Sequence, residues 1–318
     1  MHIPDGFLSV RVAVATACTA LVGLGSACAA LRVARSTNRA LLGVSAAFVF
    51  AAQLVNFPIV AGTSGHLIGA TLCVALLGLP SAIVVMSAVL IVQCLVFGDG
   101  GLLALGANIT NMALVSSLVS DAIYRLACGR APSPTRRVAS VAFAAWCAIV
   151  VSSAVCAGEL ALSGAARAGV VVPAMVLVHA VIGVAEAAIT ALVVASVARF
   201  RLELLEHDAA TIPGNLLRAA FALALAVALA LAPFASASPD GLERVAAQLG
   251  LHARSWFAAP LSNYALPGLP LGAFSVALSG VLGTLCMFGS CWLLARALVR
   301  EPRAAESPEA SAVAEPSG

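Results

Sequence analysis

The chain has 318 residues, of which 62% are hydrophobic and only 10% are charged, and its formal net charge is +3. Soluble domains carry about 25% charged residues, so this composition excludes a soluble protein and predicts one embedded in a membrane. All 17 basic residues are arginines. A P-loop needs a lysine to hold phosphates, so this type of nucleotide site is also excluded.

Nine hydrophobic segments follow one another along the chain. A bilayer core of about 30 Å takes about 20 helical residues, and a membrane allows only helices or closed barrels. Long uncharged runs favour helices, because barrel strands alternate over about ten residues. We therefore expect an all-α polytopic membrane protein with spans at residues 8–31, 40–57, 63–79, 81–97, 102–127, 138–160, 170–199, 217–235 and 270–296.

The first four segments pose two questions. No basic residues precede the first one, unlike in a secretory signal peptide, although small residues at 26–30 resemble a cleavage site; we expect the segment to be retained. Residues 40–98 contain no Asp, Glu, Lys or Arg, and Pro58 and Pro80 with nearby glycines break this run into three pieces. The middle piece, 63–79, is short enough to be a re-entrant half-helix.

Charge distribution favours a crossing over re-entry. With nine crossings and the N-terminus outside, 13 arginines lie on the inner side and four on the outer side. If residues 63–79 were re-entrant, every later loop would lie on the opposite side of the membrane, and the excess of arginine on the inner side would be lost. The positive-inside rule therefore predicts nine crossings, with the C-terminus in the cytoplasm.

The segments divide into two domains. A polar stretch, with a linker at 206–216, separates seven predicted helices in residues 1–205 from two in residues 217–300. The outer loop 236–270 contains SPDGLERVAAQLG, which predicts a turn and a short helix, and the tail 301–318 has a disordered composition. The nine cysteines lie mostly in hydrophobic segments without a CxxC motif, which is typical of small apolar side chains.

The chain begins MHIPDGFL, with a histidine directly after the methionine. The free amine of Met1, the amide nitrogen of His2 and the Nδ1 atom of His2 close a five-membered and then a six-membered ring around a metal ion, and neither ring is strained. A planar nitrogen set is typical of Ni(II) or Cu(II), and low-spin Co(II) can follow. This chelate leaves one corner of the plane open for a second imidazole.

His66, in SGHLIGA, is the candidate for that corner. It lies near the outer end of a predicted span, on the same side as the N-terminus. Ser64 precedes Gly65, and together they allow close backbone approach. Asn108, also near the outer side, is a candidate to hold a ligand in place by hydrogen bonding. The alternative is that His2 is a solvated terminal residue and His66 a hydrogen-bonded histidine at a helix cap.

His179 and Glu186 lie seven residues apart in VHAVIGVAEAAIT, and Thr190 follows four residues later. Helical periodicity places all three on one face. An ionisable residue inside a membrane is a functional candidate by default. The alternatives are a proton relay, a second metal site and a hydrogen-bonded clamp between helices, and we favour the clamp.

Four stretches resemble the CbiM/NikM family, the cobalt- and nickel-specific substrate-binding components of energy-coupling factor transporters. They are MHIPDGFL, SGHLIGA, QCLVFGDGGLLALGANITNMA and HAVIGVAEAAIT, and the resemblance covers about residues 1–200. SPDGLERVAAQLG and its two flanking spans resemble the PDGLE domain, a two-helix module often fused to this family in place of an accessory subunit.

The resemblance implies a seven-helix bundle plus the two-helix module, with metal held by Met1, His2 and His66. It also implies a transmembrane coupling protein and cytoplasmic ATPases as partners, which fits the missing P-loop; no nucleic acid is implied. We therefore expect a non-enzymatic component for Co²⁺ or Ni²⁺ uptake in a bacterial inner membrane, without a prosthetic group. Cobalt would serve cobalamin synthesis, and nickel would serve nickel enzymes.

Two rival functions remain. A proton-coupled secondary transporter centred on His179 and Glu186 would work without ATPase partners and tolerate a blocked N-terminus. An intramembrane enzyme would need a convergent acid, base and nucleophile, whereas the sequence offers only this one His/Glu pair.

Overall fold

The computed structural model describes residues 1–33, 38–59, 62–130, 132–200, 205, 212–254, 256–269 and 272–299. These residues form an almost entirely helical bundle, which confirms the predicted all-α class. The only sheet in these ranges is a two-residue hairpin, in which β1 (Phe57–Pro58) pairs with β2 (Ser64–Gly65) in antiparallel fashion.

The α-helices are α1 (Val10–Val33), α2 (Arg39–Gln53), α3 (Ala70–Leu77), α4 (Leu79–Val92), α5 (Leu105–Asn108), α6 (Ser116–Cys128), α7 (Pro134–Leu162), α8 (Ala168–Phe200), α9 (Gly214–Ala226), α10 (Gly241–Gln248) and α11 (Ala273–Leu298). Short π- or 3₁₀-helical stretches extend or join them: η1 (Gln93–Phe97), η2 (Ile109–Val115), η4 (Val227–Leu231), η5 (Ala232–Phe234) and η6 (Ser262–Tyr264).

Six helical stretches are long and apolar enough to cross a membrane, namely Val10–Val33, Leu79–Phe97, Pro134–Leu162, Ala168–Phe200, Gly214–Phe234 and Ala273–Leu298. The predicted second span is represented by α2, with 15 residues, and the fifth by α5, η2 and α6 in succession. The proposed linker 206–216 lies largely outside the described residues, and the tail 301–318 lies wholly outside them.

The expected helix over 63–79 is wrong in its first half. Residues 63–69 are not helical, and α3 has only eight residues, or about 12 Å of helix. Glycines explain the difference. A Cβ at Gly65 would approach Ile182 and Ile59 to 2.8 Å, and Gly69 adopts a left-handed φ of 86° before α3 begins.

Side chains satisfy the backbone of this non-helical segment, as a membrane interior requires. The Gln53 amide donates to the Ile68 carbonyl oxygen at 2.7 Å, and the Gly69 N–H donates to Glu186 at 3.2 Å. Hydrogen bonds from α2 and α8 therefore hold the segment that carries His66.

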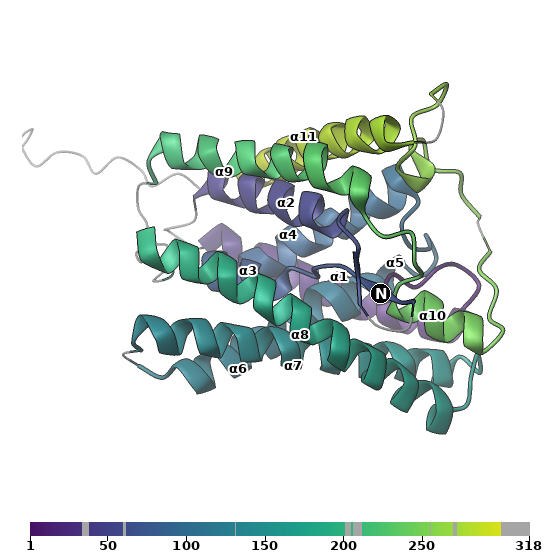
Figure 1. Cartoon of the computed structure of the whole chain (residues 1–318). Coiled ribbons are helices and arrows are strands. Elements are labelled where there is room, and N and C mark those ends of the chain that lie inside the picture. The colour runs from purple at the N-terminus through teal and green to yellow at the C-terminus, as the bar shows by residue number, and fades with distance from the viewer. Residues whose placement is uncertain are drawn as a thin grey trace, which may run out of the picture.

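The two C-terminal helices pack against the rest of the bundle along α2 (Figure 1). A Cβ added at Gly43 of α2 would lie 3.1 Å from Phe288, and one at Gly283 of α11 would overlap the Phe50 ring. Between these helices, the loop turns back over the end of the bundle where the N-terminus lies (Figure 1). Its predicted short helix is confirmed as α10, which begins with a capping box formed by Asp240 and Glu243.

Candidate metal site

The first residues of the chain fold into the interior of the protein. Met1, Ile3 and Phe7 are 4%, 1% and 6% exposed, so this segment is not a solvated leader. Its first anchor is Asn108, whose Oδ1 accepts the Ile3 N–H at 2.7 Å and whose Nδ2 donates to the Ile3 carbonyl at 3.1 Å. These bonds fix the backbone next to the proposed chelate, and the role of Asn108 in supporting a metal ligand stays a prediction.

A second anchor joins Asp5 to the loop after η1. The Asp5 carboxylate accepts the N–H groups of Leu102 and Leu103 at 3.1 and 2.8 Å. Glycines allow the close approach: a Cβ at Gly100 would lie 2.8 Å from Asn108 Nδ2, and one at Gly101 would overlap Asp5. The glycines of the FGDGG motif therefore leave the space in which the N-terminal residues pack.

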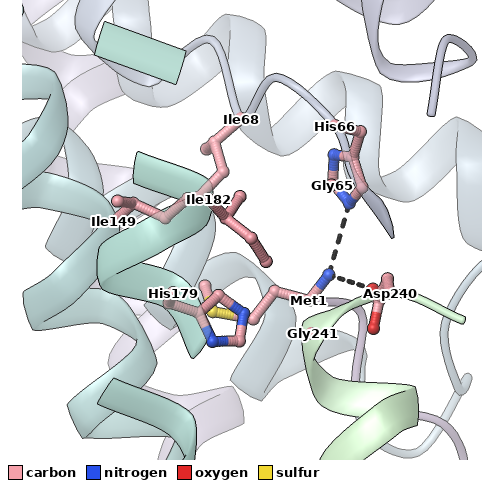
Figure 2. A pocket seen from close by; sticks show the side chains of 9 residues that line it. All are labelled: Met1, Gly65, His66, Ile68, Ile149, His179, Ile182, Asp240 and Gly241. Carbon is pink, nitrogen blue, oxygen red and sulfur yellow. Dashed lines mark hydrogen bonds and ion pairs between the residues drawn. The ribbon is translucent and has the colours of Figure 1, made fainter. Parts of the chain in front are cut away.

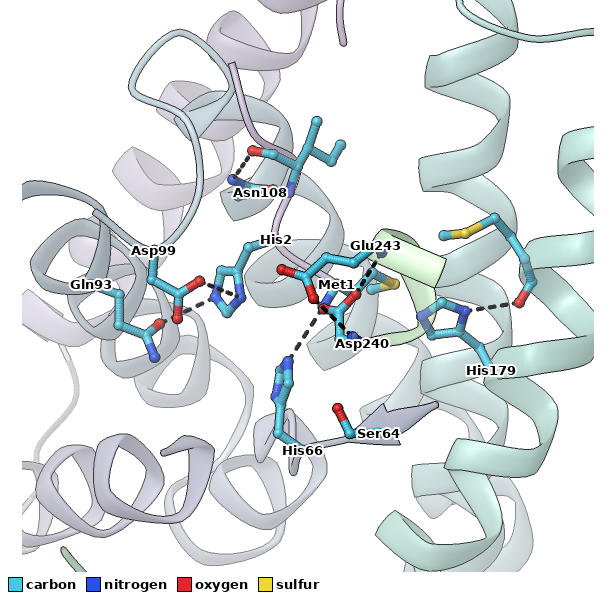
Figure 3. Close-up of polar contacts among 12 residues, drawn as sticks. Met1, His2, Ser64, His66, Gln93, Asp99, Asn108, His179, Asp240 and Glu243 are labelled. Atoms are coloured by element: carbon cyan, nitrogen blue, oxygen red, sulfur yellow. Dashed lines mark hydrogen bonds and ion pairs between the residues drawn. The ribbon is translucent and has the colours of Figure 1, made fainter. Parts of the chain in front are cut away.

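These anchors bring the three proposed ligand residues together: Figure 2 shows Met1 beside His66, and Figure 3 shows both with His2. The Met1 amine lies 3.3 Å from Nε2 of His66. The His2 and His66 rings stack with centroids 5.5 Å apart and an interplanar angle of 23°. Neighbouring corners of a nitrogen plane with metal bonds of about 2.0 Å lie about 2.8 Å apart. The amine and His66 are thus near the separation that adjacent ligands require.

The cavity beside these ligands measures about 10 Å³, close to the space that one water molecule occupies. Met1, His66, His179 and Asp240 contribute to its wall (Figure 2). Among the described residues, no three His, Cys, Asp or Glu side chains form a group that could hold a metal ion. The predicted site differs from such a group, because it counts the Met1 amine among its ligands.

Two carboxylates face the proposed ligand nitrogens (Figure 3). Asp240 Oδ2 lies 2.5 Å from the amine, and Asp99 Oδ1 lies 3.2 Å from Nδ1 of His2. Burial alone would lower the pKa of the amine, but attraction to Asp240 and their hydrogen bond raise it above the ordinary value. Burial would raise the pKa of Asp240, but the amine holds it well below its usual range.

The pKa of Asp99 is lowered in a similar way. Burial would raise the pKa of this carboxyl, but His2 and the hydroxyl of Tyr264, which donates at 2.7 Å, together lower it. Tyr264 and Asp240 both belong to the loop between α9 and α11. The C-terminal module therefore contacts the amine directly and the His2 imidazole through Asp99.

The remaining sequence candidates have separate roles. Ser64 donates from Oγ to the Ser238 carbonyl at 2.7 Å, so it joins the hairpin to the C-terminal module. His179 borders the cavity, and its Nδ1 lies 2.8 Å from the Met175 carbonyl oxygen of its own helix. Glu186 instead accepts the Gly69 N–H, directly before α3 begins, at 3.2 Å. The clamp between helices by His179 and Glu186 stays a prediction.

Sequence reasoning missed the contacts of Asp240 with the Met1 amine and of Asp99 with His2, and it missed the hydrogen bond of Tyr264 to Asp99. A signal existed for the two aspartates, which lie in the motifs FGDGG and SPDGLE. An aspartate at a turn is, however, ordinary turn chemistry, so the motifs alone did not indicate contact with the N-terminus.

Comparisons with known proteins agree on one kind of molecule. The family model described as CbiM, cobalt uptake substrate-specific transmembrane region, matches residues 2–204, and the PDGLE domain matches residues 214–300. A putative fused nickel transport protein NikMN from Archaeoglobus fulgidus is 37% identical over 93% of this chain and 98% of its own length. A fused nickel transport protein NikMN from Rhodobacter capsulatus is 37% identical over 64% of each chain.

Solved structures give the same result over about two thirds of the chain. A crystal structure of a transition metal transporter shares 31% sequence identity with a TM-score of 0.57. The match covers 65% of this chain and 97% of that chain.

Proposed function

Because the chain belongs to the CbiM family, fused to a PDGLE domain, we propose that it takes up Ni²⁺ or Co²⁺ as the substrate-binding membrane component of an ATP-driven energy-coupling factor transporter. Metal transport by a membrane protein of this type is common to its relatives. Binding would occur in a nitrogen plane at the N-terminus, and the metal would be released inward when partner ATPases cycle.

One observation carries this proposal: the Met1 amine and His66 border a cavity the size of one water molecule, and the His2 ring stacks on the His66 ring. The amine, the His2 amide and the two imidazoles supply four nitrogens. A planar nitrogen set suits Ni(II), and low-spin Co(II) fits the same plane. We give nickel a slight preference. If cobalt is the cargo, it would feed cobalamin synthesis.

ATP would be hydrolysed by other subunits, because the chain has no lysine for a P-loop. We propose a transmembrane coupling protein and cytoplasmic ATPases as partners, so this chain is a transport component and not an enzyme. The arginine bias supports an inner-membrane topology with the N-terminus outside and the C-terminus in the cytoplasm. Residues 1–205 would form the metal-binding domain and residues 217–300 the module.

The module's loop would close the metal site. Asp240 forms an ion pair with the Met1 amine, and Asp99 contacts Nδ1 of His2. Tyr264 donates a hydrogen bond to Asp99. An arriving metal ion must replace both carboxylate contacts, and the loop must let this happen. Gly241 lets the loop pack closely against His179, because a Cβ there would lie 2.7 Å from Cε1 and 2.9 Å from Nε2 of His179.

Replacing Gly241 by valine is therefore expected to lift the start of α10 from the site and to speed metal release. We expect the dissociation rate of Ni²⁺ to rise at least about tenfold, because closed access slows dissociation. Stopped-flow chelator competition measures this rate. Ala247→Val, on the exposed face of the same helix, is the matched control and should leave the rate unchanged. Equal rates in both variants would count against a closing role.

Uptake by cells tests the function itself. Cells that express the chain together with its coupling protein and ATPases should accumulate radioactive Ni²⁺ or Co²⁺, and an ATPase variant without hydrolysis should abolish this accumulation. The rival secondary transporter predicts the reverse: uptake would continue without ATP hydrolysis, collapse with the pH gradient, and depend on His179 and Glu186.

A further inference from the structure

Two buried glutamines connect His2 with the segment that carries His66. Gln93 in η1 is 0% exposed, and Gln53 at the end of α2 is 6% exposed. Oε1 of Gln93 lies 3.3 Å from Nε2 of His2, and Nε2 of Gln93 donates to Oε1 of Gln53 at 2.7 Å. Nε2 of Gln53 in turn donates to the Ile68 carbonyl at 2.7 Å. A continuous line of hydrogen bonds, the glutamine relay, thus runs from one imidazole to the neighbourhood of the other.

The backbone carbonyl at the end of the relay fixes the direction of every bond in it. A carbonyl oxygen only accepts, so Gln53 must present its NH₂ group to Ile68 and its oxygen to Gln93. Gln93 must then donate to Gln53 and present its own oxygen to His2. Two acceptors cannot bond to each other, so Nε2 of His2 must carry a hydrogen.

We propose that Gln53 and Gln93 are positioning residues that make His2 bind the metal through Nδ1. With the hydrogen on Nε2, the lone pair on Nδ1 is the one available to a metal. This is the nitrogen that closes the unstrained six-membered ring with the His2 amide. In the metal-free chain it lies 3.2 Å from the Asp99 carboxylate, an acceptor, so it shares a hydrogen with Asp99 until a metal ion takes the place of that hydrogen. The inference rests on the proposed N-terminal metal site.

The relay also sets the position of the second imidazole. Ile68 follows His66 by two residues, and its carbonyl is the end point of the relay. A metal-binding histidine generally donates its other ring N–H to an acceptor that fixes its orientation. Here the acceptor is Gln93, which is linked through Gln53 to the Ile68 carbonyl in the segment that carries His66. The same hydrogen bonds therefore orient the His2 and His66 rings relative to each other.

Nitrogen NMR of the full chain, labelled with ¹⁵N-histidine and loaded with Ni²⁺, tests the ring assignment without any substitution in the relay. Planar low-spin Ni²⁺ is diamagnetic, so the imidazole signals remain observable, and loss of one signal pair in a His2→Gln sample assigns His2. We expect the proton on Nε2 and the metal on Nδ1. A metal-bound Nε2 would overturn the proposal.

A double-mutant cycle tests the coupling. Gln53→Met and Gln93→Met should each weaken Ni²⁺ binding about 10- to 100-fold, as loss of a ligand's hydrogen-bond partner generally does. Both substitutions interrupt one relay, so the double variant should bind no more weakly than the weaker single variant. Effects that multiply would instead show independent packing roles and would contradict the relay.

Asn111→Leu is the matched control, because Asn111 is an amide as buried as Gln93 but bonds to Glu159. It should leave Ni²⁺ binding unchanged; an equal loss would assign the effect to general disturbance of the buried polar groups. If the native chain and a chain extended before Met1 bind Ni²⁺ alike, the proposed metal site itself fails. If only the native chain binds but His2 uses Nε2, the relay alone fails.

Discussion

Replacing His66 by alanine is expected to weaken Ni²⁺ binding at least about 100-fold. Its Nε2 lies 3.3 Å from the Met1 amine, so it is the imidazole placed to fill the corner that the N-terminal chelate leaves open. Loss of a partner that only orients a ligand costs 10- to 100-fold, so loss of a ligand itself should cost at least as much. Ni²⁺ titration of the purified variant in detergent measures the change.

His252 is the matched control for this experiment. It lies on the same loop system as Asp240 but is exposed, whereas His66 is 8% exposed. His252→Ala should bind Ni²⁺ as the unmodified chain does. If His66→Ala binds equally well with an intact fold, the fourth ligand is another group, and the planar site as proposed is wrong.

One added residue before Met1 is expected to have the largest effect, a loss of Ni²⁺ binding of at least about 1,000-fold. The extension moves the free amine by one residue, up to about 3.6 Å, so the five-membered ring with the His2 amide can no longer form. The protein has no room for the displaced group, because Met1 is 4% exposed and the adjacent cavity measures about 10 Å³. Every side chain of the site is retained.

A removable leader provides the control for the extension. A leader that a protease cuts directly before Met1 should block Ni²⁺ binding before cleavage and restore it afterwards. Helix content of the two forms should agree, because α1 begins only at Val10. Failure to regain binding after cleavage would mean that the leader prevents binding by damaging the fold and not by blocking the amine.

The helical bundle and the proximity of Met1, His2 and His66 were within reach of sequence reasoning. Helix spans follow from hydrophobic length, and the arginine bias placed His2 and His66 on one side of the membrane. Their pairing could then be proposed, because the free amine, the amide and Nδ1 of a histidine at position 2 can form a planar chelate that leaves one corner open for a second imidazole. The structure brings their rings to a centroid distance of 5.5 Å.

The carboxylate contacts could not be predicted in this way. Asp240 is 239 residues from Met1 in the chain, and Tyr264 is 165 residues from Asp99. Such pairs depend on how the loop between the last two helices folds back over the bundle, which no periodicity in the sequence describes. The glutamine relay has the same origin, because it joins α2, η1 and the N-terminus in space.

The segment 63–79 shows how composition can mislead. Its hydropathy is that of a membrane helix, but seven of its residues are extended or in turns because glycines let the backbone approach Ile182 and Val49. The backbone groups thus released are satisfied by Gln53 and Glu186. Hydropathy reports burial from water, and here the burial is in protein and not in lipid.

The most direct measurement is a Ni²⁺ and Co²⁺ titration of the full chain with its native start beside the chain with one residue added before Met1, followed by the absorption of the planar metal site. We expect tight binding with the absorption of a planar nitrogen set for the native start and loss of both for the extended chain. Equal binding and the same absorption in both chains would show that the amine is not a ligand and that the proposed planar site is wrong.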